Sequence, residues 1–405
     1  MMLKETLREI AKSQAVELGK AELGIEREAL DKIDLKLPFA IVLSGARRSG
    51  KSTLLHQLMK KTGKAYYFNF EDSRASGFEL GDFERLDEVL KEMGGEGGTY
   101  FFDEIQNVER WELFVRTRLD RKAHFAITGS NASLLSAELG TRLTGRHLRT
   151  ELFPFSYSEF LSFKRLKAGK DSLGRYLKDG GFPEYLQTGR ADVLQELLAD
   201  ILLRDIAVRH QIRNVKALKE MAVFLLSNVG KDFSYNSLAN TFSLGSSNTA
   251  MDWVAYLEDS YLLFSLPKFD YSLKKQAVNS RKIYSVDTGL TLANSASFSP
   301  DEGRMLENAV FLHLRRKFMA GNLFYFRENK ECDFLVREKD KIIHAVQACR
   351  ELDENDKKRE IDGLVEAMEK FGLEEGVIVT LDQEDRLKVG EKTIKLVPAW
   401  KWMQE

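Results

Sequence analysis

The stretch GARRSGKST at residues 45–53 limits most strongly what this chain can fold into. It follows the apolar run FAIVLS and precedes LLHQLM. Gly45, Gly50, Lys51 and Ser52 satisfy the pattern G-x-x-x-x-G-K-[ST], which has meaning only where a strand precedes it and a helix begins inside it. Glycines let backbone N–H groups curve around phosphate oxygens, and the helix N-terminus adds its positive end. The stretch therefore predicts a strand, a phosphate-binding loop and a helix in direct succession.

Each polar side chain of this loop has an expected role toward ATP. Lys51 is expected to reach the β- and γ-phosphates, and Ser52 to ligate Mg²⁺. Arg47 and Arg48 are expected either to touch phosphate or to pair with an acid in the segment FNFEDSR. The alternative is a chance match of the motif on a structural loop. The predicted nucleotide-binding residues are Gly45, Ala46, Arg47, Arg48, Ser49, Gly50, Lys51, Ser52 and Thr53.

A second apolar stretch, TYFFDEIQNV at residues 99–108, carries two adjacent carboxylates where the expected strand ends. Asp103 is expected to hold Mg²⁺ through its water shell, and Glu104 to polarise the attacking water as a general base. A protein that only binds ATP has little use for the second acid. The pair therefore favours ATP hydrolysis over ATP binding alone.

Two further segments carry candidates for the transfer of the γ-phosphate. In HFAITGSNASLL, Ser130 and Asn131 stand at the tip of the next expected strand, where a γ-phosphate sensor belongs. Ordinary turn formation is the alternative, because Ser and Asn are common in turns. In TRLTGRH, Arg142 and Arg146 are candidates for an arginine finger, within one chain or from a neighbouring subunit of an oligomer. A solvated basic loop is the alternative there.

The alternation of apolar runs and helical patterns divides the 405 residues into three parts. From about residue 38 to 153 the alternation is typical of a doubly wound α/β layer with a mainly parallel sheet. From about 160 to 265 helical periodicity dominates and no strong strand candidate occurs. Beyond about 280, strands at LFYFRE, CDFLVR, IIHAVQA and GVIVTL alternate with helices. We therefore expect an α/β P-loop domain at 1–160, a helical segment at 161–285 and a C-terminal α/β domain at 286–405.

Composition argues against several classes of protein. Lys and Arg number 61 and Asp and Glu number 62, so no global field draws the chain to nucleic acid or to a membrane. No window approaches the ~20 apolar residues of a membrane span, and the first 30 residues lack the apolar core of a signal peptide. Two cysteines are too few for a disulfide framework. These observations predict a cytoplasmic protein with no membrane partner.

In this series of motifs the chain resembles a family of archaeal and bacterial AAA-type ATPases that carry a C-terminal domain of unknown function. The resemblance covers nearly the whole chain and rests on these segments: GARRSGKST, FFDEIQNVERWELFVR, ITGSNASLLS, TGRHLRTELFPFSYSEFL, GGFPEYL, LLRDIAVRHQIRN, FLLSNVGKDFSYNSLA, YLEDSYLLF, KIYSVDTGL, GRMLEN and ECDFLV. It implies an ATPase core, a helical segment with a winged helix-turn-helix, and a C-terminal restriction-endonuclease-like module similar to PD-(D/E)XK nucleases.

Residues 217–263 have the spacing of a helix-turn-helix. A helix ends near Gly230, a short helix begins after Ser234, and a third helix starts near Ser246. The segment DSYLLFSLPKF that follows is expected to supply the wing. Small polar residues at the start of the third helix either contact DNA or only cap the helix. These residues are Ser246, Ser247, Asn248 and Thr249.

A basic cluster follows the expected wing and consists of Lys268, Lys274, Lys275, Arg281 and Lys282. Such a cluster is expected to hold the backbone of double-stranded DNA through its phosphates. The alternatives are a solvated surface, a dock for the ATPase core, or contact with a protein partner.

The C-terminal module has the start of a nuclease site and lacks one ligand. A PD-(D/E)XK fold brings a helix Glu, a strand Asp and a (D/E)-x-K pair together around Mg²⁺. The resemblance places Glu307 in the first role and Asp333 in the second. Strand alternation then puts Ala345 and Gln347 where the acid and the lysine belong, with Glu331 as a partial substitute for the acid. The sequence favours a retained, degenerate site over an active nuclease.

Three functional hypotheses follow. The first is a Mg²⁺-dependent ATPase whose nucleotide state rearranges the other domains on DNA. The second is a slow-turnover nucleotide switch that acts through DNA or a protein partner. The third, an ATP-gated DNA endonuclease, depends on Glu307 and Asp333 and is weakened by Ala345.

Overall fold

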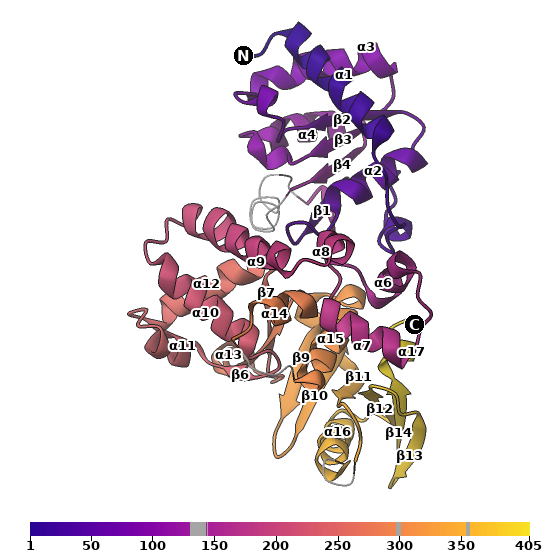
Figure 1. Cartoon of the computed structure of the whole chain (residues 1–405), viewed down its shortest axis with the longest axis vertical. Helices are drawn as coiled ribbons and strands as arrows, with labels where there is room; N and C mark the ends of the chain where they lie inside the picture. Colours follow the sequence, from indigo (N-terminus) through magenta and orange to yellow (C-terminus); the bar gives the residue numbers. More distant parts are fainter. Residues whose placement is uncertain (130–142, 144, 297–300, 354–356) are drawn as a thin grey trace. The chain divides into compact units, whose positions relative to one another are not determined.

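The chain folds into two compact units, Met1–Leu152 and Phe153–Glu405. The computed structural model describes residues 1–129, 143, 145–296, 301–353 and 357–405 (Figure 1). The predicted division into 1–160, 161–285 and 286–405 stays a prediction. Within the described ranges, no helix has both the length and the apolar character that crossing a membrane requires.

The first unit is built on a parallel sheet with the strand order β2-β3-β4-β1-β5. The predicted alternation of strands and helices is confirmed here. Because the strands are parallel, the residues that end β1, β3 and β4 meet at one edge of the sheet. The elements are α1 (Lys4–Lys20), β1 (Ala40–Gly45), α2 (Lys51–Lys61), β2 (Ala65–Asn69), α3 (Phe83–Gly94), β3 (Thr99–Asp103), α4 (Trp111–Asp120), β4 (Phe125–Thr128) and β5 (His147–Leu152).

Both faces of this sheet are buried. Along β1, Ala40 and Val42 belong to one apolar core, whereas Ile41 and Leu43 belong to a second. The first core contains side chains of α1, α3 and α4, and the second contains those of α2. A strand that is buried on both faces needs an unbroken apolar run. This requirement explains why FAIVLS, rather than an alternating pattern, leads into the loop.

The second unit begins with helices and contains a small antiparallel sheet of order β6-β8-β7. β6 has only two residues, which explains why the sequence gives no strand signal there. β7 lies inside the segment expected to form the wing. The elements are α6 (Tyr157–Lys164), α7 (Lys170–Asp179), α8 (Pro183–Thr188), α9 (Ala191–Asp200) with its π-helical continuation Ile201–Val208, α10 (Val215–Ser227), β6 (Asp232–Phe233), α11 (Tyr235–Thr241), α12 (Ser247–Asp259), β7 (Leu263–Pro267), α13 (Leu273–Val278), β8 (Arg281–Ser285) and α14 (Thr288–Asn294).

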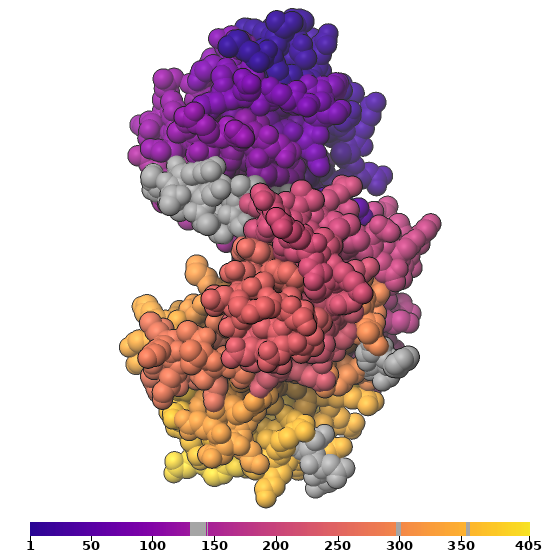
Figure 2. All heavy atoms as spheres, turned by 90° about the vertical axis from the view of Figure 1, so that its left-hand side faces the viewer, coloured from indigo at the N-terminus to yellow at the C-terminus, as the bar shows by residue number. Residues whose placement is uncertain are grey.

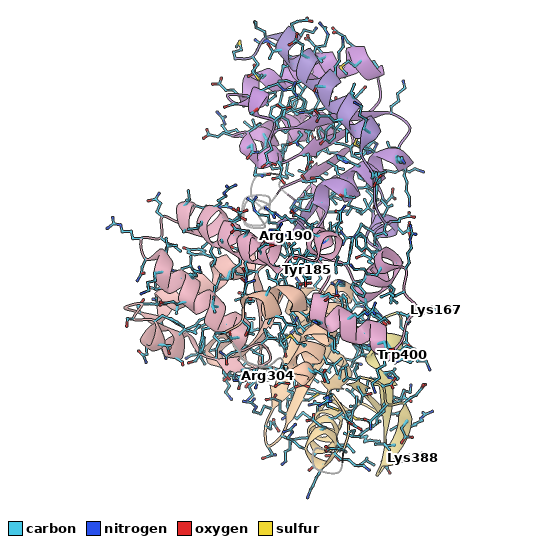
Figure 3. The ribbon with its side chains drawn as sticks, viewed as in Figure 1. Lys167, Tyr185, Arg190, Arg304, Lys388 and Trp400 are labelled. Carbon is cyan, nitrogen blue, oxygen red and sulfur yellow. The ribbon has the colours of Figure 1, made fainter. Side chains whose placement is uncertain are left out.

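The rest of the second unit forms a mixed sheet of order β13-β14-β12-β11-β10-β9. The four predicted strands are confirmed, whereas the hairpin of β13 and β14 was not predicted. Trp400 lies in the last helix (Figure 3). Its indole N–H donates to Asp382 at 3.0 Å and ties this helix to the loop after β12. The elements are α15 (Glu302–Lys317), β9 (Leu323–Arg327), β10 (Glu331–Glu338), β11 (Lys341–Ala348), α16 (Lys357–Phe371), β12 (Glu375–Thr380), β13 (Asp385–Val389), β14 (Lys392–Pro398) and α17 (Ala399–Trp402).

Candidate functional site

The predicted phosphate-binding loop connects the buried strand β1 directly to helix α2. Gly45 and Gly50 have φ angles of 149° and 94°, which residues with a Cβ rarely adopt. A Cβ on Gly45 would lie 2.0 Å from the carbonyl oxygen of Leu152, the residue that pairs with Gly45 across β1 and β5. The first glycine of the motif is therefore required by the neighbouring strand as well as by the loop.

The interior of the loop carries a positive charge and a buried hydroxyl. The Nζ atom of Lys51 donates to the carbonyl oxygens of Gly45 and Ala46 at 3.1 and 3.0 Å. Ser49 is fully buried, and its Oγ atom has no hydrogen-bond partner among the described residues. A buried polar atom without a partner calls for a ligand or a water molecule. The loop therefore fits an anion such as the phosphates of ATP.

The loop is also held from the N-terminal side by Arg27, which sequence reasoning missed. Its guanidinium donates to the carbonyl oxygen of Ser49 at 2.7 Å, and its backbone N–H donates to Gln57 of α2 at 3.2 Å. Only 3% of Arg27 is exposed. No motif marks the segment before β1, so no pattern in the sequence points to this residue.

The other predicted residues of the loop lie at its outer side and in the first turn of α2. Arg47 is half-buried and Arg48 is exposed, with a φ of 62°. Ser52 and Thr53 are half-buried. In the segment FNFEDSR, the carboxylate of Asp72 pairs with Arg74 of the same segment at 2.7 Å.

Asp103, the last residue of β3, is held by two hydroxyl groups. The Oγ1 atom of Thr128 donates to one carboxylate oxygen, and Tyr67 donates to the other at 3.4 Å. Thr128 also accepts a hydrogen bond from the backbone N–H of Glu104 at 3.0 Å. Asp103 is 2% exposed and Thr128 is fully buried. Thr128 thus joins the two predicted acids, although the sequence placed the sensor two and three residues later, at Ser130 and Asn131.

Glu104 lies in a left-handed backbone conformation with a φ of 51°, which is rare for a residue with a side chain and occurs often at functional sites. Its carboxylate accepts a hydrogen bond from Gln106. Burial raises the pKa of Glu104, and the nearby Lys51 ammonium opposes this increase. The structure therefore brings the second acid into the electrostatic reach of the loop lysine.

The candidates for phosphate sensing and for the arginine finger are placed only in part. Ser130, Asn131 and Arg142 lie outside the described residues. Arg146 precedes β5 and forms an ion pair with Asp120, and both side chains are about half exposed. Surface ion pairs of this kind stabilise a fold by only about 0–1 kcal/mol, so this pairing leaves Arg146 able to exchange partners.

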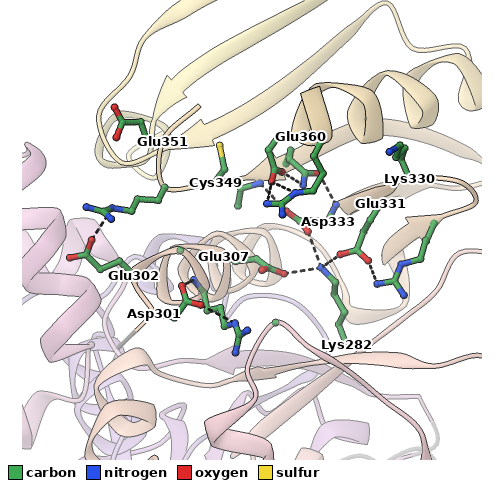
Figure 4. A pocket seen from close by; sticks show the side chains of 18 of the residues that line it. Lys282, Asp301, Glu302, Glu307, Lys330, Glu331, Asp333, Cys349, Glu351 and Glu360 are labelled. Atoms are coloured by element: carbon green, nitrogen blue, oxygen red, sulfur yellow. Dashed lines mark hydrogen bonds and ion pairs between the residues drawn. The ribbon is translucent and has the colours of Figure 1, made fainter. Parts of the chain in front are cut away.

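A second cluster of polar residues lies in the other unit, where Glu307 of α15 and Asp333 of β10 approach the same lysine (Figure 4). This lysine is Lys282 of β8. Its Nζ atom lies 3.0 Å from Glu307, 2.7 Å from Glu331 and 2.8 Å from Asp333. Because Lys282 is only 2% exposed, its expected place in a basic surface for DNA is wrong. The residue turns inward with β8 instead.

Gln347 belongs to the same cluster. It accepts a hydrogen bond from the backbone N–H of Asp333 at 3.0 Å and donates to Glu360 of α16 at 2.6 Å. Ala345 is 1% exposed and packs in the apolar core beside α16. The predicted set of Glu307, Asp333 and Gln347 therefore comes together. At the position where the acid is missing, Ala345 packs in the apolar core. Sequence reasoning missed Glu360 and the position of Lys282.

The charges of this cluster depend on one another. Burial raises the pKa of Glu307 to about 7, against the opposing influence of Lys282. Burial alone would lower the pKa of Lys282, but Asp333, Glu307 and Glu331 hold it well above its ordinary value. The cluster lines a cavity of about 1060 Å³ whose other lining residues include Arg304, Lys330, Arg350 and Arg359.

Three family models match successive parts of the chain. Residues 38–161 match an AAA domain, residues 170–301 match the domain of unknown function DUF8612, and residues 302–402 match the domain of unknown function DUF4143. The P-loop and the two acids at the end of β3 lie in the first match.

Two relatives align along most of their length. The uncharacterized protein MJ1544 of Methanocaldococcus jannaschii is 35% identical, over 96% of this chain and 92% of that protein. An uncharacterized protein of Haemophilus influenzae is 31% identical, over 87% of this chain and 93% of that protein.

Similarity to solved structures is more distant. The Walker-type ATPase PABY2304 of Pyrococcus abyssi has a TM-score of 0.42 and 16% identity, over 63% of this chain and 90% of that chain. AMPPCP-bound DnaA from Aquifex aeolicus has a TM-score of 0.28 and 16% identity, over 61% and 88%. By its identity to the two full-length relatives, the chain belongs to the family of MJ1544, and it consists of an AAA-type P-loop domain followed by two domains of unknown function.

Proposed function

We propose that this protein hydrolyses ATP in the presence of Mg²⁺ and that hydrolysis changes the arrangement of its domains. The observation that carries this proposal is the arrangement around Thr128, which holds Asp103 by its carboxylate and Glu104 by its backbone. Asp103 ends β3 and Glu104 follows it. In the sheet, β3 is separated from β1 only by β4. The phosphate loop and the two acids therefore belong to the same edge.

The proposed roles follow from the chemistry of each group. Lys51 and the backbone N–H groups of the loop hold the phosphates, and Ser52 with Asp103 holds the Mg²⁺ that accompanies ATP. Glu104 takes the proton of the attacking water, which its raised pKa suits because a stronger base accepts a proton more readily. Gln106 donates to the Glu104 carboxylate and orients it.

The remaining predicted residues complete the proposal. Asn131 senses the γ-phosphate, and Arg142 or Arg146 stabilises the charge that develops on it. If Arg146 is the finger, it exchanges its surface partner Asp120 for the phosphate, bound either to the same chain or to a neighbouring copy.

Release of phosphate from ATP by the purified full chain tests the proposal. Hydrolysis that requires Mg²⁺ and is absent in Lys51→Ala supports it. Tight ATP binding with no phosphate release above the Lys51→Ala background would favour the second hypothesis, a nucleotide switch.

Thr128→Val is expected to lower the ATP hydrolysis rate by about 10-fold, because residues that orient metal-binding acids typically contribute 10–100-fold to activity. Valine keeps the shape of the side chain but loses the hydrogen bonds to Asp103 and Glu104. Steady-state phosphate release measures the effect. Thr128→Ser, which keeps the hydroxyl, is the matched control and should stay close to the wild-type rate. Equal rates for Thr128→Val and wild type would contradict the role of Thr128.

We also propose that the small sheet and the helices before it bind double-stranded DNA as a winged helix-turn-helix. The order α10, β6, α11, α12, β7, α13, β8 supports this proposal, because a short helix and a turn lead into α12 as in other DNA readers. Ser246 caps α12 by accepting from Thr249 at 3.1 Å, whereas Asn248 in the first turn is exposed. Figure 2 shows the face of the molecule that carries these helices.

The basic residues that support DNA binding are fewer than predicted. Lys274 and Lys275 of α13 are exposed and lie between β7 and β8, where a wing belongs. Lys282 is buried. Lys268 and Arg281 are half-buried, and Arg281 donates to Ser265 at 3.3 Å. The proposed contact with the DNA backbone therefore rests on the two lysines of α13.

The double substitution Lys274→Glu and Lys275→Glu is expected to weaken binding of a DNA duplex by about 10-fold or more at moderate salt, because two contacts with DNA phosphates are lost. The affinity should also depend less steeply on salt concentration, because fewer counterions are released on binding. A gel shift at several salt concentrations measures both effects. Lys341→Glu with Lys388→Glu, at two exposed positions of the C-terminal sheet, makes the same change in net charge elsewhere. Equal losses in the two double variants would argue against a specific surface at α13.

A further inference from the structure

The carboxylates of Glu307, Glu331 and Asp333 are arranged about the ammonium group of Lys282, in the wall of the cavity of about 1060 Å³. An ammonium has three donor hydrogens, and the Nζ atom lies within 3.0 Å of three carboxylates, those of Glu307, Glu331 and Asp333. Lys282 donates hydrogen bonds to Glu307 and Asp333 and forms an ion pair with Glu331. The three acids come from α15 and β10, whereas the lysine comes from β8 of the small sheet.

Other groups bind these acids as well. Tyr284, which follows Lys282 by two residues on β8, donates at 2.7 Å to the same Glu307 oxygen, Oε1, that Lys282 binds. The second oxygen of Asp333 accepts from the backbone N–H of Ala348 at 3.0 Å. Arg327 forms an ion pair with Glu331. The oxygens that face the centre of the cluster are thus those that Lys282 already binds.

Mg²⁺, which the resemblance to PD-(D/E)XK nucleases implies, does not fit these residues. Mg²⁺ binds oxygen at about 2.0–2.1 Å and requires near-octahedral geometry, so it would need the place that the Nζ atom fills. Ala345 offers no oxygen where that site requires a side-chain ligand, and its methyl group is packed in the apolar core.

We propose that Lys282 is a tethered counter-cation that supplies the positive charge a divalent metal would supply elsewhere. It closes the acidic cluster to metal ions and fastens the small sheet to α15 and β10. In this proposal the carboxylates of the C-terminal domain connect the small sheet, through Lys282, to the mixed sheet that contains β10. They do not serve to cleave DNA. Without the lysine these three acids, one buried and two half-buried, would repel one another, so the joint depends on this one side chain.

Lys282→Met tests the proposal in the full chain, in a Lys51→Ala background and without nucleotide, so that the ATP site contributes no metal binding. The melting temperature is expected to fall by about 5 °C or more, because a buried charge network loses its only central cation. Added Mn²⁺ should restore much of this loss and bind with one more equivalent than in the parent chain, measured by titration calorimetry. Lys330→Met, at an exposed lysine that lines the same cavity, should change neither quantity.

The parent chain provides a test that does not depend on the folding of the variant. The parent chain and Asp333→Asn should bind the same amount of Mn²⁺ in a titration, because the acidic cluster holds no metal ion. Plasmid DNA incubated with the parent chain and Mg²⁺ or Mn²⁺ should stay intact. Mn²⁺ binding or nicking that disappears in Asp333→Asn would overturn the proposal, because the cluster would then admit a metal. A Lys282→Met chain that is as stable as its parent would overturn it too. None of these results depends on whether the first unit hydrolyses ATP.

Discussion

Replacing Glu104 by Gln is expected to lower the rate of ATP hydrolysis by at least about 100-fold, the usual contribution of a positioned general base. Gln keeps the size of the side chain and its hydrogen-bonding capacity toward Gln106, but it cannot take a proton from water. ATP binding should be retained, because Lys51 and the loop glycines are unchanged. The measurement pairs phosphate release with the affinity for a fluorescent ATP analogue.

Two controls separate catalysis from binding in this experiment. Lys51→Ala should lose both affinity and hydrolysis, because the ammonium inside the loop is removed. Gln106→Ala should keep affinity and show a smaller loss of rate than Glu104→Gln, since it only frees the carboxylate to rotate. If Glu104→Gln and wild type release phosphate equally slowly, the chain is a nucleotide switch and Glu104 is not a base.

The substitution Gly363→Ala is expected to destabilise the second unit by about 3 kcal/mol or more, because overpacking a tight contact forces the backbone to move. Gly363 lies on the face of α16 that meets β10, and a Cβ there would lie 1.9 Å from the carbonyl oxygen of Glu331. The helix must shift away from the strand that carries two acids of the cluster. Thermal unfolding monitored by circular dichroism measures the loss.

A second helical glycine gives the opposite prediction and serves as the matched control. Gly174 lies in the interior of α7 and is exposed, and a Cβ there would meet no atom within 4 Å. Gly174→Ala should therefore stabilise the chain by about 0.5–1 kcal/mol through helix propensity. If Gly363→Ala raises the melting temperature, as Gly174→Ala is expected to do, close packing of α16 on β10 is not what Gly363 provides.

The nucleotide site was predicted from the sequence where its chemistry is local. The loop at residues 45–53 is one continuous segment with a fixed pattern, and Asp103 and Glu104 are neighbours at the end of an apolar strand. Thr128 and Arg27 were missed because their importance arises only when a distant segment is packed against them. Thr128 meets Asp103 across 25 positions of the sequence, and Arg27 meets Ser49 across 22.

Lys282 shows how neighbours in the sequence can mislead. It stands among other basic residues and was therefore assigned to a surface, although the alternation of β8 places it on the same face as Tyr284. Both side chains contact Glu307. The alternation was visible in RKIYS, but nothing in the sequence says that acids from a helix and a strand further along the chain would lie opposite this face.

The pairing of β1 with β5 has a mechanical consequence. Gly45, where the phosphate loop begins, is hydrogen-bonded in register with Leu152, the last residue of the first unit. The backbones of β1 and β5 approach so closely here that a Cβ at Gly45 would collide with the carbonyl oxygen of Leu152. If ATP hydrolysis moves the loop, as proposed above, we expect β5 to move with it. The peptide bond after Leu152 leads directly into the second unit. Leu152 is therefore the single residue between the strand pairing at the phosphate loop and the start of the second unit.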